Sequence, residues 1–202
     1  MSNTILNNVT FAYVKIAAPV NKYQSADTEF TVDCIVSKAD AKAWNKNFPK
    51  QKAKEVDNTE FVDKLKMDLP FPDQDEQYII KLKKPDIKNG KQLDPKYRPR
   101  IFLAQEGASP TDITFDVLVA NGSKGKASYA VRTNDYGTFA QLDAILVEDL
   151  IEYRSTAVVG AAFGVTENKP APDMPVVNKQ SEAFAKQESP VTEVEEEDTS
   201  PF

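Results

Sequence analysis

Apolar and polar residues alternate along several short stretches of this chain, and this pattern predicts β-strands. The clearest case is residues 29–36, where Phe30, Val32, Cys34 and Val36 fall on one face. Strands are expected at residues 9–17, 29–36, 77–84, 99–104, 113–120, 126–133 and 142–153. The last of these also fits a helical period, and we interpret it as a strand.

Two helices and two turns interrupt this pattern. Residues 37–51 (SKADAKAWNKNFPKQ) are rich in alanine and lysine, with Ser37 as a candidate N-cap and Phe48-Pro49 as a stop. A second short helix is expected at residues 60–67. Asn89-Gly90 and Asn121-Gly122 are strong turn signals.

Short strands at regular spacing favour a small β barrel or sandwich. The five-stranded OB-fold fits the length, so we expect a mainly β, OB-fold-like barrel with extra strands and a helical insertion. We place it in one domain, residues 1–166. The insertion follows the second strand, whereas the usual OB order puts a helix after the third.

Residues 167–202 have a different composition, with five of the thirteen prolines, no glycine and no apolar period. Such a segment cannot bury enough surface to offset its ordering entropy, so a disordered linker and acidic tail are expected. A simple solubility tail is the alternative. The terminal Pro201-Phe202 favours docking into a basic-rimmed apolar pocket instead.

Charge is distributed unevenly around the net value of −6. Residues 169–202 hold eight acids and three lysines, whereas residues 41–100 hold fifteen Lys and Arg against ten Asp and Glu. This asymmetry indicates a nucleic-acid surface together with an acidic tail.

The residue types also exclude several functions. The chain has no histidine, which removes the commonest general base and metal ligand. The single cysteine, Cys34, is in the apolar phase of its strand and is interpreted as core. No transmembrane run or signal peptide is visible, so a cytoplasmic protein is expected. No cofactor is expected.

One acidic cluster leaves metal chemistry as an alternative. Asp68, Asp73, Asp75 and Glu76 are grouped in DLPFPDQDEQY, without the glycine that an EF-hand loop needs. A solvated turn explains these acids, and no metal site is expected. A magnesium-dependent nuclease is the less favoured interpretation of the same residues.

Cations and aromatic residues are interleaved on several expected strands. Sequence-tolerant binding of single strands needs cations for the phosphates and aromatic faces on which bases stack, at ~1–3 kcal/mol each. In YIIKLKK two lysines share one face, and in KYRPRIFLA an arginine and a phenylalanine share the face opposite Ile101 and Leu103. The candidate DNA-binding residues are Phe11, Tyr13, Lys15, Lys81, Lys83, Lys96, Tyr97, Arg98, Arg100, Phe102, Lys124 and Lys126.

Each candidate also has an ordinary structural interpretation. Tyr129 is in phase with Ala127 and Val131, and Trp44 lies on the expected first helix, so both are interpreted as core residues. Lysines on strands often serve only to protect an edge. The DNA-binding interpretation therefore depends on the pairing recurring across several strands.

The final residues, 195–202, resemble the acidic tip of bacterial single-stranded DNA-binding proteins. Residues 97–107 (YRPRIFLAQEG) and 118–153 (LVANGSKGKASYAVRTNDYGTFAQLDAILVEDLIEY) are similar to phage-encoded members with an OB-fold and an acidic C-terminus. The resemblance implies DNA replication, recombination and repair in the cytoplasm of an infected bacterium. It also implies a tail that recruits a polymerase, helicase or primase and competes with DNA. The residues given this role are Glu195, Glu196, Glu197, Asp198, Pro201 and Phe202.

A phage structural or adaptor protein, whose β domain binds other proteins, is the alternative from another class. The expected protein is not an enzyme. Its oligomeric state stays open between monomer and homodimer.

Overall fold

The computed structural model describes residues 3–22 and 24–153. The predicted domain boundary at residue 166 and the predicted tail lie outside these residues. The strands are β1 (Asn3–Asn21), β2 (Thr28–Val36), β3 (Lys54–Asp57), β4 (Glu76–Lys88), β5 (Lys91–Gln92), β6 (Arg100–Gln105), β7 (Ala108–Asp112), β8 (Lys124–Asn134) and β9 (Gly137–Asp149). The helices are α1 (Lys38–Asn47), α2 (Asn58–Leu65) and the 3-10 turn η1 (Pro95–Tyr97).

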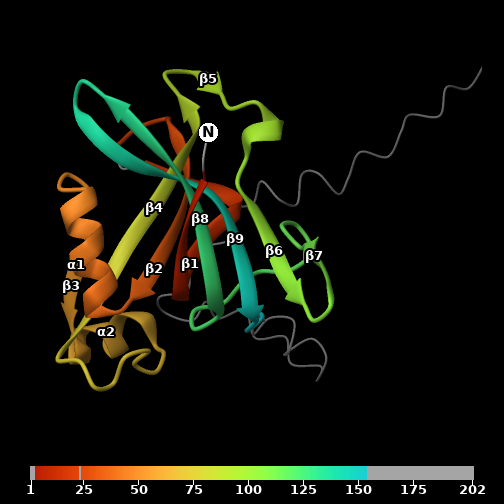
Figure 1. The fold of residues 1–202 in the computed structure, drawn as a ribbon. Helices are drawn as coiled ribbons and strands as arrows, with labels where there is room; N and C mark the ends of the chain where they lie inside the picture. The colour runs from red at the N-terminus through yellow and green to blue at the C-terminus, as the bar shows by residue number, and fades with distance from the viewer. Residues whose placement is uncertain (1–2, 23, 154–202) are drawn as a thin grey trace, which may run out of the picture. The chain divides into compact units, whose positions relative to one another are not determined.

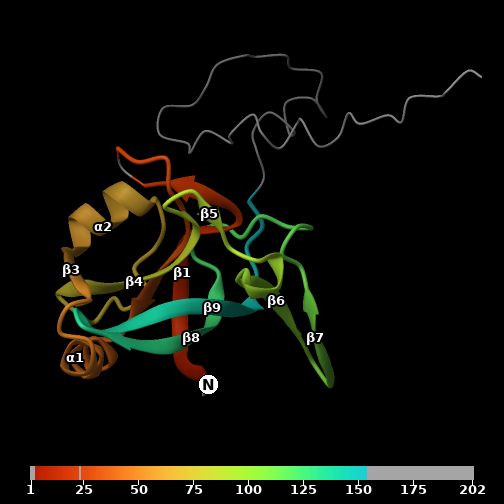
Figure 2. The same ribbon diagram turned by 90° about the horizontal axis from the view of Figure 1, so that it is seen from above.

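Five strands close into a barrel. β4, β2, β1, β8 and β9 are antiparallel neighbours in that order, and a parallel pairing of Lys83 with Gln141 joins β4 to β9. The strand order and the parallel closure confirm the predicted mainly β, OB-fold-like class. β3 extends the sheet beside β4, and β6 with β7 extends it beside β9. Figures 1 and 2 show α1, α2 and β3 on one side of the barrel and β6 and β7 on the other.

The helical insertion follows the second strand, as predicted. Ser37 caps α1 by accepting from the Asp40 backbone N–H, and the helix ends at Phe48. Asp57 caps α2 in the same way. Trp44 is buried and its Nε1 donates to the Gln51 carbonyl, 2.6 Å away, which fixes the chain that follows α1.

The barrel interior contains the predicted apolar face of β2, because Phe30, Val32, Cys34 and Val36 are all buried. Burial raises the pKa of the Cys34 thiol, as expected of a core cysteine. Trp44 and Tyr129 are buried in the same cluster, as predicted.

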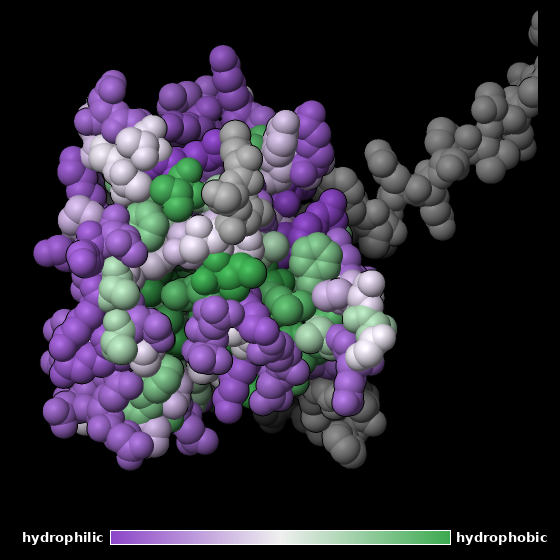
Figure 3. Space-filling model, viewed as in Figure 1, coloured by the Kyte–Doolittle hydropathy of each residue, from purple (hydrophilic) through white to green (hydrophobic). Residues whose placement is uncertain are grey.

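A second, smaller core lies on the outer face of the sheet. It contains Ala12 and Ile35 from the barrel and Val56, Phe61 and Leu65 from β3 and α2. This core attaches the helical insertion to the barrel. On the face drawn in Figure 3, hydrophilic residues surround a band of apolar side chains.

The predicted face of Phe11 is wrong, because this ring is fully buried in the barrel. β1 has a bulge: Ala12 is opposite Asp33 and Lys15 is opposite Thr31, so three steps along β1 match two along β2. Tyr13 takes the left-handed conformation there, with φ 46°. The extra residue inverts the alternation before the bulge, which is why Phe11 faces inward.

The predicted strand at residues 113–120 is also wrong. Residues 114–116 form a turn, and only Val119 makes an isolated bridge, to Glu152. The Thr114 hydroxyl donates to Asp112 and accepts from the Ile101 backbone N–H at 2.9 Å, so side-chain bonds replace a strand ladder. The other predicted strands are present, and residues 142–149 belong to β9.

Candidate nucleic-acid interface

A groove lies on the outer face of β2 and β4. It has a volume of about 550 Å³ and is called the β2–β4 groove below. Its lining comes from β1, β2, β3, β4, α2, β9 and the segment between α1 and β3. The lining residues are Tyr13, Asp33, Lys50, Gln51, Lys52, Lys54, Val56, Phe61, Lys64, Leu65, Ile79, Lys81, Lys83, Phe139 and Ala140.

The floor of this groove is set by strand register. On β4, Ile80 and Leu82 are buried in the barrel, so Lys81 and Lys83 point outward as predicted. Thr31 of β2 is paired with both Lys83 of β4 and Lys15 of β1, so these residues form one row across the sheet. Lys15 is half-buried, and burial lowers its pKa.

One wall is the segment between α1 and β3. The Gln51 side-chain amide donates to the Lys81 carbonyl on β4 at 3.1 Å and to the Ala140 carbonyl on β9 at 3.3 Å. Its Oε1 accepts from the Ala140 backbone N–H at 2.9 Å. The amide therefore bridges the seam where β4 and β9 close the barrel. Lys50 Nζ donates to the Tyr136 carbonyl in the β8–β9 turn.

The opposite wall is α2 with Tyr13. The Tyr13 hydroxyl donates to the Lys64 carbonyl at 3.2 Å, and its backbone N–H donates to Asn121 Oδ1 at 2.9 Å. Tyr13 keeps 40% of its surface exposed. Its ring and Phe139, which is half-buried at the start of β9, are the accessible aromatic groups of the groove.

Acidic groups also reach this surface. Lys81 Nζ lies 3.4 Å from Asp33 Oδ1, and Lys83 Nζ donates to Glu29 Oε1 at 2.9 Å. Burial raises the pKa of Asp33, although Lys81, Lys83 and Lys54 favour its charged form. The charged form of Asp33 therefore carries a desolvation penalty on the groove floor, which the nearby lysines partly offset.

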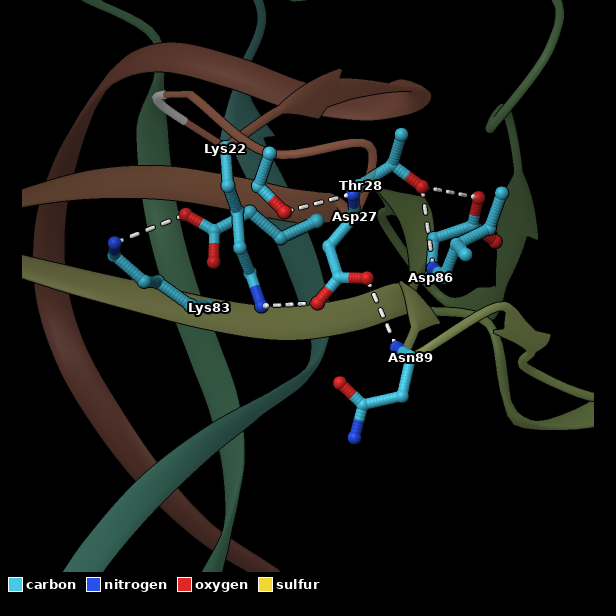
Figure 4. Close-up of polar contacts among 9 residues, drawn as sticks. Lys22, Asp27, Thr28, Lys83, Asp86 and Asn89 are labelled. Atoms are coloured by element: carbon cyan, nitrogen blue, oxygen red, sulfur yellow. Dashed lines mark hydrogen bonds and ion pairs between the residues drawn. The ribbon is translucent and has the colours of Figure 1, made fainter.

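The end of β4 forms a second basic feature, at the predicted Asn89-Gly90 turn. The loop between β1 and β2 is tied to it, since Asp27 Oδ1 accepts from the Asn89 backbone N–H at 2.9 Å (Figure 4). Thr28 Oγ1 donates to Asp86 Oδ2 at 3.0 Å in the same close-up. A hollow of about 490 Å³ beside this turn is lined in part by Lys88 and Lys91.

The structure brings together only part of the predicted site. Tyr13, Lys81 and Lys83 line the groove, and Lys15 lies in the same row of the sheet as Lys83. The other predicted residues, apart from the buried Phe11, are not part of its lining. They are Lys96, Tyr97, Arg98, Arg100, Phe102, Lys124 and Lys126.

Several of those outlying cations are paired. Arg98 lies 3.5 Å from Asp86, Arg100 lies 3.2 Å from Asp112, and Lys126 lies 2.6 Å from Glu148. The alternation along β6 was predicted correctly, since Ile101 is buried and Phe102 is half-exposed. A role for these residues in DNA binding stays a prediction.

Five residues that line the groove were not among the predicted DNA-binding residues. They are Lys50, Lys52, Lys54, Lys64 and Phe139. The alternating lysines of KQKAK at residues 50–54 were a usable signal, because an extended segment places them on one side. Phe139 carried no such signal, since its position depends on how β9 closes against β4.

The described residues were also compared with the requirements of a metal site and of a membrane-spanning helix. Within residues 3–22 and 24–153 no group of three or more Asp, Glu or Cys side chains could hold a metal ion. No helix in these same ranges is long and apolar enough to cross a membrane.

No protein-family model matches the chain, and no curated protein matches it significantly. Among solved structures, it is similar to a C-terminally truncated single-stranded DNA-binding protein from bacteriophage Enc34, with 13% identity and a TM-score of 0.46 over 75% of this chain and 88% of that one. The Enc34 protein in complex with single-stranded DNA gives 14% identity and a TM-score of 0.43, over 76% and 89%. The single-stranded DNA-binding protein gp2.5 of bacteriophage T7 gives 15% and 0.43, over 75% and 93%.

Proposed function

We propose that this chain binds single-stranded DNA in the β2–β4 groove, without reading its sequence. One observation carries the proposal: six lysines and two accessible aromatic rings line a single groove. Lysines supply the counter-charge for phosphates, and aromatic faces accept bases of any type. The half-buried Ile79 in the groove adds apolar surface that bases can cover.

The position of the groove in the barrel supports the same function. In OB-folds, oligonucleotides bind on the face of the second and third strands, between the loops that join the first to the second and the fourth to the fifth. Here these strands are β2 and β4, and the second loop is the β8–β9 turn that Lys50 contacts. A duplex hides its base faces in the stack, so Tyr13 and Phe139 favour single strands.

The wider role follows from the sequence. We infer a non-enzymatic phage protein of replication, recombination and repair, acting in the cytoplasm of the infected bacterium. The acidic residues 195–198 and the terminal Pro201-Phe202 suit recruitment of a polymerase, helicase or primase. This role is supported by the charge asymmetry of the chain and by its sequence resemblance to phage single-stranded DNA-binding proteins.

Charge removal on the groove wall tests the DNA-binding site. The double variant K50A/K52A is expected to weaken binding of fluorescent oligo(dT) and to reduce the salt dependence by about 0.7 for each phosphate that no longer has a lysine partner. The matched control, K42A/K46A, removes two exposed lysines from α1 outside the groove. Equal weakening in the two variants would show that only net charge matters and that the groove is not the site.

A further inference from the structure

The six lysines of the β2–β4 groove are of two kinds. Lys81 and Lys83 are each paired with a carboxylate of the neighbouring strand β2. Lys52, on the wall, makes no ion pair with any residue in the described ranges. The groove therefore contains both neutralised and unneutralised cations.

The two carboxylates on β2 are held in place. Strand pairing sets Asp33 opposite Lys81, and the side chains of Asp33 and Glu29 are only 13% and 14% exposed. Neither group can turn into solvent as an exposed acid would. By contrast, Glu60, which pairs with Lys64 on the rim, is 46% exposed.

Asp33 and Lys81 form a close ion pair. Lys81 Nζ lies 3.4 Å from Asp33 Oδ1, and Lys81 favours the charged form of this carboxylate. A phosphate approaching Lys81 therefore meets a fixed negative charge directly beside the ammonium group. Such a phosphate competes with a carboxylate that is already present.

We propose that Asp33 and Glu29 are internal counter-ions, which hold the affinity of the groove for a nucleic-acid backbone below what its lysines could provide. This proposal rests on the proposed function of the same groove. A lysine that already has a protein counter-ion releases fewer solution ions when a phosphate binds. Lys81 and Lys83 thus contribute less to affinity and to salt dependence than Lys52 does.

The β2–β4 groove therefore releases a bound strand more readily than a groove with only unpaired lysines. Proteins that coat single strands must leave them when another enzyme needs the template. A fixed carboxylate next to each floor lysine lowers the cost of separating that lysine from a phosphate, because the ammonium group regains a partner when the phosphate leaves.

A double-mutant cycle tests the proposal. Oligo(dT) binding is titrated over a salt series for the wild type, D33N, K81A and D33N/K81A, with thermal unfolding to confirm that each variant folds. D33N is expected to tighten binding about two- to fivefold, the scale of an ion pair near the surface. It should also steepen the salt dependence by about 0.7, equivalent to one further phosphate neutralised. E29Q is expected to act in the same way through Lys83.

Two controls separate this effect from a change in overall charge. E106Q removes one exposed acid from the β6–β7 turn and should tighten binding less than D33N. K52A should weaken oligo(dT) binding by the same factor in the wild-type and D33N backgrounds. K81A should weaken binding more in the D33N background than in the wild type.

The outcomes are distinct. Additivity of D33N and K81A, or equal effects of D33N and E106Q, would overturn the counter-ion proposal while leaving the groove as the binding site. A wild-type chain with no salt-sensitive binding to oligo(dT) would overturn the proposed function and this inference together.

Discussion

Single residues decide which side chains lie on the outer face of this barrel. The bulge at Tyr13 shifts β1 by one residue, so Phe11 enters the core while Tyr13 and Lys15 stay on the outer face. Alternation alone predicted all three on one side. A bulge has no fixed sequence signature, because almost any residue can adopt it when the partner strand requires it.

Phe139 is expected to stack on a base. Replacing it with alanine should weaken oligo(dT) binding by about 1–3 kcal/mol without changing the salt dependence, since stacking releases no counter-ion. Titrations at several salt concentrations measure both quantities. F115A is the control, because Phe115 is 69% exposed and lies outside the groove. A changed salt slope in F139A would mean that the variant disturbs the lysines instead.

Asp33 should also affect stability in a pH-dependent way. Its pKa is raised in the folded state, so the folded protein holds this proton more readily than the unfolded chain. Stability from this group is therefore gained as the pH falls from the raised pKa towards the ordinary value of 3.8, and it disappears as the pH rises.

D33N removes this contribution. The difference in unfolding free energy between D33N and the wild type, measured in urea from pH 4 to pH 7, should shift in favour of D33N as the pH rises. Other carboxylates titrate equally in both proteins and cancel from the difference. A difference that is flat across this range would show that Asp33 is not desolvated as the structure indicates.

Elements were easier to predict than the way they pack together. The alternation of β2, the capping of α1 and the Asn89-Gly90 turn follow from local chemistry, and the structure confirms them. The groove could not be predicted in the same way. It exists because β2 and β4 pair in one register and because the segment after α1 returns across the seam between β4 and β9.

The Gln51 side chain joins β4 to β9 through its bonds to Lys81 and Ala140. Replacing Gln51 therefore tests how much this link contributes to stability and to the groove. Q51A should lower the unfolding free energy by about 1–3 kcal/mol, because backbone groups of Lys81 and Ala140 are left without their hydrogen-bond partner. It should also weaken DNA binding by releasing Lys50 and Lys52 from the wall.

Two further variants make this test specific. Q51E places a carboxylate against two carbonyl oxygens and should be no more stable than Q51A. Q105A changes an exposed glutamine at the end of β6 and should alter neither property. If Q51A binds DNA as the wild type does while folded, the amide stabilises the barrel without positioning the lysines.

At the scale of the whole molecule, the charge asymmetry predicts competition between the acidic C-terminal residues and DNA. Deleting residues 190–202 should tighten oligo(dT) binding, most strongly at low salt, because a tethered anion has an effective concentration on the order of millimolar. Screening removes the effect as the Debye length falls below ~10 Å. Equal affinities of the two chains at low salt would show that these residues do not compete.

Removing only Phe202 distinguishes docking to replication proteins from competition with DNA. The acids remain, so the affinity for oligo(dT) should stay close to that of the full chain. Capture of a purified replication polymerase or helicase should fall, because the terminal aromatic anchor is removed. Unchanged capture would assign recruitment to another part of the chain.

The central claim is the location of the DNA strand, and cross-linking tests it most directly. Ultraviolet light joins an oligonucleotide containing 5-iodouracil to aromatic side chains that it contacts, and mass spectrometry identifies the linked peptides. The β2–β4 groove predicts cross-links at Tyr13 and Phe139. Cross-links confined to Tyr97 and Phe102, on the side of η1 and β6, would contradict it and place the strand on the opposite side of the barrel.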